Sequence, residues 1–264
     1  MKKKGEARKL NAKKIWGLIG YAAALTVWVF CVVVASQLIA GIIMGFFITA
    51  EQLQQPMWSG ITYLISYIIE IPLIIFVPHK LMTMWRSRNA KKTNDKEQPI
   101  SREELGLKEL PTWVDLGLAP VGFIMSTVAA LGLTWFFSLF QWFNAVETQV
   151  SLEESGFTPY MNNGEKIIAF LTLVIAAPIV EELVFRGWLY GKLRAKLNVV
   201  ASILIVSVLF GIMHFQWNVG VNVFALSVVC CVLREITGTI YAGILTHMIK
   251  NGVAFYLLYV LGFG

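Results

Sequence analysis

The sequence contains few charged residues. Of its 264 residues, 14% are Asp, Glu, Lys or Arg, whereas 57% are hydrophobic. Soluble globular domains carry about 25% charged residues, so this composition excludes an ordinary soluble domain. Apolar stretches recur along the chain, and several have the roughly 20 residues that a helix needs to cross a bilayer. We therefore expect a single integral membrane domain over residues 1–264, with no sizeable soluble module.

Cysteines are few, and the signature motifs of several hydrolase classes are missing. None of the three cysteines, Cys31, Cys230 and Cys231, forms a C-x-x-C pair with metal-ligand spacing. We expect them to be packing or lipid-facing residues. The absence of H-E-x-x-H excludes a zincin-type site. The absence of G-x-S-x-G and of an intramembrane aspartate pair weakens serine and aspartyl schemes.

The apolar stretches predict an all-α protein, a polytopic transmembrane helical bundle of about seven spans, within a range of six to eight. The first span is longer than one crossing needs, so we expect it to tilt, to project beyond the bilayer, or to break near Gly41 and Gly45. The fifth and sixth are short, and we place their connecting turn, "HFQWNVG", partly inside the membrane. The seven expected spans are 15–48, 57–79, 113–140, 166–190, 198–214, 218–234 and 239–262.

Basic residues are distributed unevenly between the loops. Seven lie within residues 1–14 and eight lie from Lys80 to Lys108, whereas the loops 50–56 and 141–165 contain none. Because loops rich in Lys and Arg stay in the cytoplasm, we expect a cytoplasmic N-terminus and an external C-terminus. We attribute the net charge of +6 to this asymmetry between the loops, and we expect it to attract anionic membrane lipid. We expect no nucleic-acid partner.

Two of the connections carry further information. The segment "SREELGLKEL" begins with Ser101 and Glu104 at capping-box spacing, which predicts a short helix on the inner surface before the third span. The segment 141–165 holds four acidic residues and no basic one. We expect it to be an external loop that is mobile or that covers an entrance.

Three charged residues stand inside the fourth span, in "APIVEELVFRGWLYGKL". A charge at the bilayer centre is costly, so each one needs a reason to be there. Glu182 and Arg186 are four residues apart with the acid on the N-terminal side, which favours an ion pair on one helix face. Glu181 points about 100° away from Glu182, so the two should not face one site squarely. We predict that Arg186 neutralises Glu182 and that Glu181 is free for chemistry.

Two later spans carry polar residues at the same four-residue spacing. Phe210 and His214 end the fifth span in "FGIMHF", and His247 and Asn251 lie in the seventh, in "THMIKNG". At about 1.5 Å per residue, Glu181, His214 and His247 lie roughly 15, 22 and 12 Å from the inner ends of their spans. We expect these groups to converge, because packing alone does not account for such a set inside a membrane.

This set of side chains suits the hydrolysis of a peptide bond. The reaction needs a base that activates water and a donor that stabilises the developing oxyanion. Glu181 supplies the base, a histidine shares the water, and the His and Asn side chains donate to the oxyanion. Glu181, His214 and His247 can instead hold a zinc ion with water in the open position. The residues alone leave both schemes open.

Three short motifs, in order and on separate spans, resemble those of the CPBP family of intramembrane proteases. This family includes the CAAX prenyl endopeptidases and many bacterial proteins, some of them linked to bacteriocin self-immunity. The resemblance covers about residues 166–255. The matching residues are Glu181, Glu182 and Arg186 for E-E-x-x-x-R, Phe210 and His214 for F-x-x-x-H, and His247 and Asn251 for H-x-x-x-N.

The resemblance implies a glutamate-dependent endopeptidase of the bacterial cell membrane, acting on a membrane-associated peptide or protein. Glu181 and His214 would activate the water, and His247 and Asn251 would hold the oxyanion or complete the site. Specificity for CAAX substrates does not carry over from the motifs. The implied catalytic core is 166–255, with Glu181, His214, His247 and Asn251 catalytic and Glu182, Arg186 and Phe210 supporting.

Two further charged residues lie inside predicted spans. Glu70 stands in "ISYIIEIPLII", close to Pro72, which bends the helix. We expect Glu70 to pair with a basic side chain, and the alternative is a role in a substrate channel or in proton transfer. Lys250 points about 100° away from Asn251. We expect it to reach the interface or to meet an acid.

Two other classes of protein fit the same residues. A non-catalytic membrane protein that binds a peptide, such as a bacteriocin-immunity factor, would tolerate the loss of Glu181 chemistry. A proton-coupled transporter would use Glu70, Glu181 and the histidines as a relay. The transporter hypothesis is weakened because the sequence has no internal repeat.

The charge asymmetry makes a prediction about topology. Single cysteines placed in residues 86–111 should be labelled by an impermeant reagent only from the cytoplasmic side, and cysteines in 145–160 only from outside. The measurement is accessibility labelling in intact and permeabilised cells, with the three native cysteines replaced. Labelling of both segments from the same side would contradict the seven-span topology.

Overall fold

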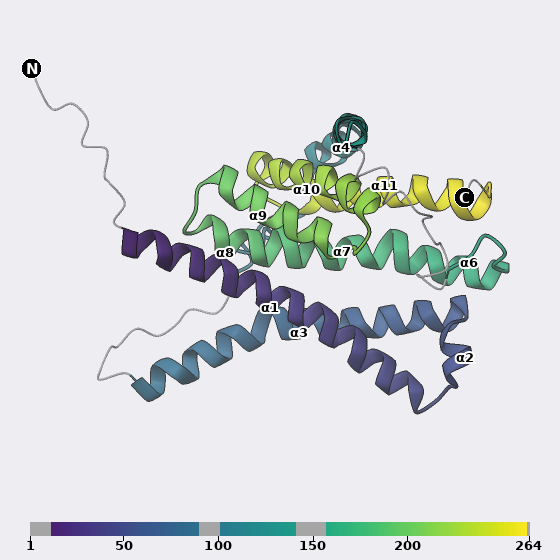
Figure 1. Cartoon of the computed structure of the whole chain (residues 1–264), viewed down its shortest axis with the longest axis horizontal. Helices are drawn as coiled ribbons and strands as arrows, with labels where there is room; N and C mark the ends of the chain where they lie inside the picture. The colour runs from purple at the N-terminus through teal and green to yellow at the C-terminus, as the bar shows by residue number, and fades with distance from the viewer. Residues whose placement is uncertain (1–11, 90–100, 141–156, 263–264) are drawn as a thin grey trace, which may run out of the picture.

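The computed structural model describes residues 12–89, 101–140 and 157–262, and this part of the chain is helical without any strand (Figure 1). The all-α fold expected from the sequence is thus confirmed. The first half consists of α1 (Ala12–Gly45), the one-turn helix α2 (Ala50–Leu53) and α3 (Pro56–Asn89). Helices α1 and α3 pack against each other and cross in the view of Figure 1.

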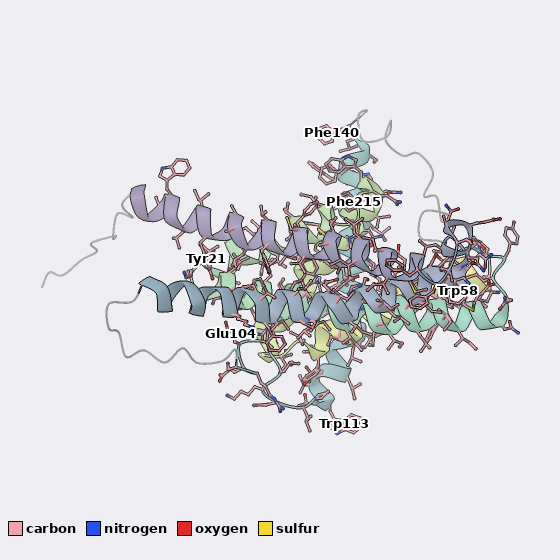
Figure 2. All side chains as sticks on the ribbon, turned by 90° about the horizontal axis from the view of Figure 1, so that it is seen from below. Tyr21, Trp58, Glu104, Trp113, Phe140 and Phe215 are labelled. Atoms are coloured by element: carbon pink, nitrogen blue, oxygen red, sulfur yellow. The ribbon has the colours of Figure 1, made fainter. Side chains whose placement is uncertain are left out.

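The remaining helices build the second part of the bundle. Helix α4 is seen nearly end-on in Figure 1, and Figure 2 shows it running across α1 and α3, with Trp113 at its start and Phe140 just beyond its end. One long helix over residues 163–194 follows, in α-helical and π-helical pieces. The elements are α4 (Trp113–Ser138), α6 (Asn163–Phe170), η2 (Leu171–Ala176), α7 (Ala177–Glu182), η3 (Leu183–Leu189), α8 (Tyr190–Arg194), α9 (Val199–Ile212), α10 (Trp217–Thr237), α11 (Tyr241–Phe255) and η4 (Tyr256–Val260).

Each of the seven predicted spans corresponds to helix. Helix α1 has no break at Gly41 and ends at Gly45. Helix α9 is apolar but has only 14 residues, and α11 continues into the π turn η4. The chain is an integral membrane protein. Within the described ranges, five helices are long and apolar enough to cross a membrane: Ile15–Gly45, Pro56–Pro78, Trp113–Ser138, Asn163–Arg194 and Trp217–Thr237.

Parts of three predicted loops lie outside the described residues. They are residues 1–11 of the basic N-terminus, residues 90–100 of the basic loop and residues 141–156 of the acidic loop. The orientation of the bundle across the membrane therefore remains a prediction from the distribution of charge.

The long helix of residues 163–194 lies at the centre of the fold. In its second half, residues 184–190 are all buried, including Val184 and Trp188. A helix that is apolar on all sides is one that neighbours surround. Here α1, α3, α9 and α10 contact its π-helical piece η3 (Figure 1). Two of the three intramembrane charges, Glu182 and Arg186, are therefore fully buried in this segment.

Helix α3 approaches the long helix closely at Gly60. A Cβ atom at this position would lie 2.5 Å from Cγ2 of Ile168 and 3.3 Å from Oγ1 of Thr172. The Thr172 hydroxyl also donates to the Gly60 carbonyl oxygen over 3.5 Å. A glycine is thus needed to bring α3 this near. Both helices run in the same direction in Figure 1, from the α2 and α6 end toward α8.

The short helix predicted at "SREELGLKEL" is only a single turn. The Ser101 hydroxyl accepts from the Glu104 backbone N–H at 3.1 Å, as capping-box spacing predicts. The turn ends at Gly106, whose φ is +70°. The Leu107 N–H donates to the Arg102 carbonyl (2.7 Å) and the Gly106 N–H to the Glu103 carbonyl (3.0 Å), which is the Schellman pattern of a helix end. The prediction of a helix was wrong because Gly106 stops it after one turn.

The close approach at Gly60 yields a prediction about stability. Gly60→Ala should destabilise the protein by about 1–3 kcal/mol, because the added methyl group overpacks the contact with Ile168. Gly17→Ala is the matched control, since nothing lies within 4 Å of a Cβ there. The control should keep or gain stability, because alanine favours helix. Thermal unfolding in detergent measures both, and equal melting temperatures would contradict the contact.

Candidate functional site

Glu181 and Glu182 lie between two π-helical pieces of the long helix. They end α7 (Ala177–Glu182), which η2 precedes and η3 follows. A π segment widens the helix and shifts the register of its side chains, and such segments are frequent at functional sites. The sequence patterns gave no sign of either π segment, because their residues are ordinary helix formers.

The predicted ion pair between Glu182 and Arg186 is present. Arg186 Nη1 lies 2.9 Å from Glu182 Oε1, and both side chains have 0% exposure. The contact does not have hydrogen-bond geometry, and the Arg186 Nε and Nη2 atoms have no hydrogen-bond partner among the described residues. The guanidinium instead stacks on Phe210, with Cζ 4.4 Å from the ring centroid. Burial of Arg186 is thus compensated by one carboxylate and one aromatic face.

His247 of α11 lies between the two glutamates. Its Nδ1 is 3.1 Å from Glu182 Oε1, and its Nε2 is 3.8 Å from Glu181 Oε2. An ionised carboxylate only accepts hydrogen bonds, so Nδ1–H is the donor to Glu182. The expectation that the two glutamates do not face one site squarely was wrong, since they approach opposite nitrogens of the same ring.

The two glutamates differ in their access to solvent. The Glu181 side chain keeps 23% exposure, whereas Glu182 has 0%. Gly243 helps to enclose Glu182, since a Cβ there would lie 3.0 Å from Glu182 Oε2. The sequence reasoning did not identify Gly243 as a residue that encloses Glu182. Its position four residues before His247, on the same helix face, is the signal that points to it.

Phe210 joins the two histidines. Its ring centroid lies 5.1 Å from that of His214 and 5.9 Å from that of His247, both in edge-on geometry. The His214 Nδ1 atom is 2.8 Å from the Phe210 carbonyl oxygen. Because a carbonyl oxygen only accepts, Nδ1 carries the proton, and the neutral ring then has an unprotonated Nε2. The F-x-x-x-H motif therefore fixes the tautomer as well as the position of His214.

The turn after His214 is strained. Phe215 has a φ of +55°, in the left-handed region, which is unusual for a bulky residue. Its exposed ring packs edge-on against Phe30 of α1, with centroids 6.2 Å apart. This contact holds the turn "HFQW" against α1 on one side. Unfavourable backbone conformations of this kind cluster at functional sites.

Asn251 is bonded to the backbone of the long helix. Its Nδ2 donates to the Leu173 carbonyl oxygen over 2.9 Å. Leu173 lies in η2, where the π-helical register changes which carbonyls are satisfied within the helix. Asn251 thus fastens α11 to the π segment before Glu181. The sequence predicted its helix face but not this acceptor.

Lys250 meets a carboxamide rather than an acid. Its Nζ donates to the side-chain oxygen of Asn222 in α10 and lies 3.3 Å from the Asn222 backbone carbonyl. Of the two alternatives expected for Lys250, reaching the interface or meeting an acid, the acid is not found among the described residues. Its place next to Asn251 in sequence does not bring it to the glutamates, because the two side chains leave α11 in different directions.

Glu70 is buried, with 4% exposure. No basic side chain in the described part of the chain forms an ion pair with it, so the expected basic partner is not found there. Its electrostatic neighbours are Glu181 of the long helix and Tyr67, one turn earlier on α3. Glu70 is thus a buried acid of α3 for which the described residues offer no basic partner.

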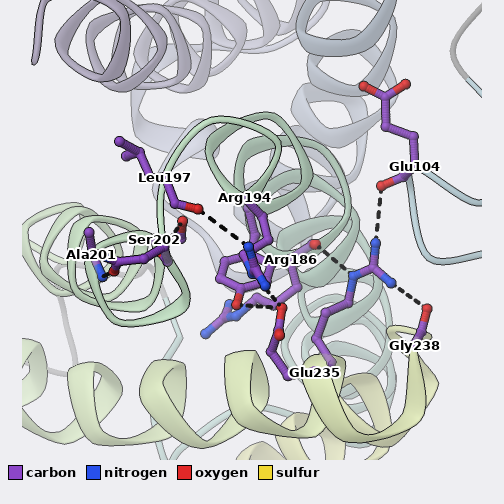
Figure 3. Close-up of polar contacts among 11 residues, drawn as sticks. Glu104, Arg186, Arg194, Leu197, Ala201, Ser202, Glu235 and Gly238 are labelled. Carbon is purple, nitrogen blue, oxygen red and sulfur yellow. Dashed lines mark hydrogen bonds and ion pairs between the residues drawn. The ribbon is translucent and has the colours of Figure 1, made fainter. Parts of the chain in front are cut away.

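Arg234 of α10 holds the backbone next to the ion pair in place. Its guanidinium donates to the carbonyl oxygens of Arg186 at 3.2 Å, of Glu104 at 3.0 Å and of Gly238 (Figure 3). Gly106 packs against the same guanidinium, and the Glu104 side chain pairs with Lys192. The turn before α4 is therefore bonded to the helix that carries the catalytic candidates.

The described residues do not form the set of ligands that zinc would need. No group of three or more His, Cys, Asp or Glu side chains lies close enough to hold a metal ion in that part of the chain. The two nitrogens of His247 face Glu181 and Glu182, and Nδ1 of His214 is engaged by a carbonyl. The geometry of the described residues does not fit the predicted triad of zinc ligands, Glu181, His214 and His247.

The buried ion pair yields a prediction about stability. Arg186→Met should destabilise the protein by about 3–5 kcal/mol, because it leaves the Glu182 charge buried without its partner. Adding Glu182→Gln should restore much of that loss, since both charges are then gone. Glu181→Gln, the adjacent control, should leave the melting temperature unchanged or raised. Additive losses from Glu182→Gln and Arg186→Met would contradict the pairing, and thermal unfolding of the four variants measures it.

Comparison with known proteins agrees with the motifs. A family model described as type II CAAX prenyl endopeptidase Rce1-like matches residues 163–253. No curated protein and no solved structure matches the chain. The matched region begins at α6 and reaches into α11, so it contains all three motifs and the residues of the site. On this match, residues 163–253 form an Rce1-like region, and the resemblance of the chain to the CPBP family of intramembrane proteases is confirmed.

Proposed function

We propose that this protein is an intramembrane endopeptidase that hydrolyses a peptide bond of a membrane-associated peptide or protein. The observation that carries the proposal is the difference between the two neighbouring glutamates. The Glu182 carboxylate is paired with Arg186 and contacts His247, whereas the Glu181 side chain keeps 23% exposure beside the same imidazole. A carboxylate that is held in position and still reaches solvent is what a general base for water requires.

Glu181 is the base in the proposed mechanism. It takes a proton from a water molecule while the water oxygen attacks the scissile carbonyl carbon. When the carbon–nitrogen bond breaks, the proton on Glu181 passes to the leaving amine. The unprotonated Nε2 of His214 accepts the second hydrogen of the water and so orients it, because Nδ1–H is already bonded to the Phe210 carbonyl.

The oxyanion of the tetrahedral intermediate needs a hydrogen-bond donor. His247 serves in its doubly protonated form: the ring enters the reaction with one proton on Nδ1, held by Glu182, and one on Nε2, which faces Glu181 at 3.8 Å, and it keeps both protons throughout. Asn251 has its amide nitrogen bonded to the Leu173 carbonyl, so its part is to set the position of α11. Glu182, Arg186 and Phe210 are the support that fixes His247 and His214.

An apolar groove beside the turn that follows His214 suits the apolar part of such a substrate. It has a volume of about 540 Å³ and lies between α4, α9 and α10. Its lining includes Gly211, Phe215 and Trp217, which flank His214 in sequence. The substrates of type II CAAX prenyl endopeptidases are lipid-modified, and a groove of this character fits a lipid chain or an apolar peptide segment.

The proposed base is tested by near-isosteric replacement. Glu181→Gln should lower the rate of cleavage by roughly 100- to 10,000-fold with expression and folding kept, because the amide cannot take the proton. His214→Ala should lose activity to a similar extent. The assay is incubation of the purified protein in detergent with prenylated CAAX peptides in one arm and an unmodified peptide library in the other.

Glu109→Gln is the control, since this carboxylate is exposed and lies in the segment before α4. It should cleave like the wild type. Full proteolysis by Glu181→Gln would show that another group is the base. A wild-type protein that binds peptides without cleaving any would favour the non-catalytic binding protein, and transport by proteoliposomes without cleavage would favour the transporter.

A further inference from the structure

The π segments η2 and η3 each leave a backbone carbonyl group without a partner inside the long helix. In an α-helix each N–H donates to the carbonyl four residues back, and in a π-helix it donates to the carbonyl five residues back. When the chain returns from the π register to the α register, one carbonyl is therefore passed over. A buried carbonyl without a donor is costly, so a donor from elsewhere has to replace the missing N–H.

In η2 the carbonyl without a helical partner is that of Leu173. The Ala177 N–H donates to the Thr172 carbonyl, which is the five-residue spacing of a π-helix. The next donor in this register would be residue 178, but Pro178 has no N–H. The Nδ2 atom of Asn251 in α11 donates to the Leu173 carbonyl at 2.9 Å and takes the place of that N–H.

In η3 the carbonyl passed over is that of Arg186. The Tyr190 N–H donates to the Phe185 carbonyl, again at five-residue spacing. Helix α8 begins at Tyr190 and restores the α register, in which the Gly191 N–H belongs to the carbonyl four residues back and passes over that of Arg186. The Nε atom of Arg234 in α10 donates to the Arg186 carbonyl at 3.2 Å and replaces the missing partner.

The two outside donors therefore lie on either side of α7, which carries Glu181 and Glu182. A π segment has about one residue more than an α-helix with the same number of turns. If η3 reverted to α-helix, the residues on its two sides would rotate relative to each other by one position, which is about 100°. Glu181 would then turn away from His247, whose Nε2 atom it faces at 3.8 Å.

The Arg234 guanidinium is itself fixed in position by its other bonds. It donates to the carbonyl oxygens of Glu104, at 3.0 Å, and of Gly238, so that all three of its nitrogens are used (Figure 3). Gly106 packs directly against the guanidinium, and its carbonyl oxygen accepts from the Ile240 N–H at 3.1 Å. The turn before α4 and the end of α10 thus hold the group that donates to η3.

We infer that Arg234 is a positioning residue of the proposed endopeptidase. Together with Asn251 it holds the π register of the long helix, and this register determines that Glu181 faces His247. Arg234 acts through the backbone carbonyl of Arg186 rather than by touching the substrate. The inference rests on the proposed function of Glu181.

Replacement of Arg234 tests its part in catalysis. Arg234→Met should lower kcat by at least about tenfold with KM within about twofold of the wild type, because the proposed base is turned while the apolar groove is unchanged. Arg234→Lys should stay within about threefold of Arg234→Met, since an ammonium group keeps the charge but lacks the planar set of donors.

Arg194→Met is the matched control for these variants. Arg194 pairs with Glu235 at 3.0 Å, so the control also removes an arginine that is bonded to the end of α10. It should keep kcat within about twofold of the wild type, because the carbonyl of Arg186 keeps its donor. Wild-type kcat in Arg234→Lys, or an equal loss of kcat in Arg194→Met, would overturn the role of the guanidinium.

Hydrogen–deuterium exchange of the purified protein needs no substrate. In both Arg234 variants the amides of residues 183–191 should exchange at least about tenfold faster than in the wild type, because η3 has lost the bond that holds its register. The amides of α6, at the far end of the long helix, should exchange as in the wild type. Unchanged exchange in residues 183–191, or an equal increase in α6, would overturn the inference. If the wild type cleaves no peptide, the proposed function fails while the exchange still decides whether Arg234 holds the register.

Discussion

The buried contact between Glu182 and Arg186 is the interaction on which the site depends. Both side chains are excluded from solvent, and their atoms are 2.9 Å apart. An ion pair in such a place is stable only if its surroundings compensate the lost hydration. The compensation comes from other helices: Phe210 of α9 lies under the guanidinium, and His247 of α11 contacts the carboxylate. The pair is therefore surrounded by the residues that we propose for the reaction.

The same contact gives the two adjacent glutamates different surroundings. Glu182 has both a cation and an imidazole N–H to satisfy it, and so it is a fixed part of the fold. Glu181 shares the imidazole only at 3.8 Å and stays partly exposed. One helix thus carries a structural carboxylate next to the one that we propose to be reactive, and their different surroundings create the difference between them. Like residues at neighbouring positions acquire unlike roles in this way.

The parts of this arrangement that sequence reasoning predicted are the local ones. The pairing of Glu182 with Arg186 and the shared face of Phe210 and His214 follow from the four-residue period of a helix. The bonds of Asn251 to the Leu173 carbonyl and of Lys250 to Asn222 were not predicted, because they join segments distant in the chain. Local spacing specifies which side chains share a face, but the partner of that face depends on packing and on register shifts such as the π segments.

For the fold too, local features could be predicted from the sequence and contacts between distant segments could not. Hydropathy predicted where the helices are, since long apolar runs need no knowledge of their neighbours. It did not predict that the turn ends at Gly106. It also did not predict that the Arg234 guanidinium of α10 donates to the carbonyl oxygens of both Glu104 and Arg186 and so joins the turn to the long helix. A polar connection with a capping signal looks like a surface helix until the residues that bind its backbone are known.

The contact between Gly60 and Thr172 joins residues 112 positions apart. Synthesis at about 5–20 residues per second separates the two by on the order of 5 to 20 seconds. During that time α3 is in the membrane without the helix that will cover its Glu70 face. A charged carboxylate facing lipid is costly, so α3 must wait in the bilayer with Glu70 neutral or associated with the translocation machinery. Because the helix that covers Glu70 is made only later, this acid of the early helix constrains how the chain enters the membrane.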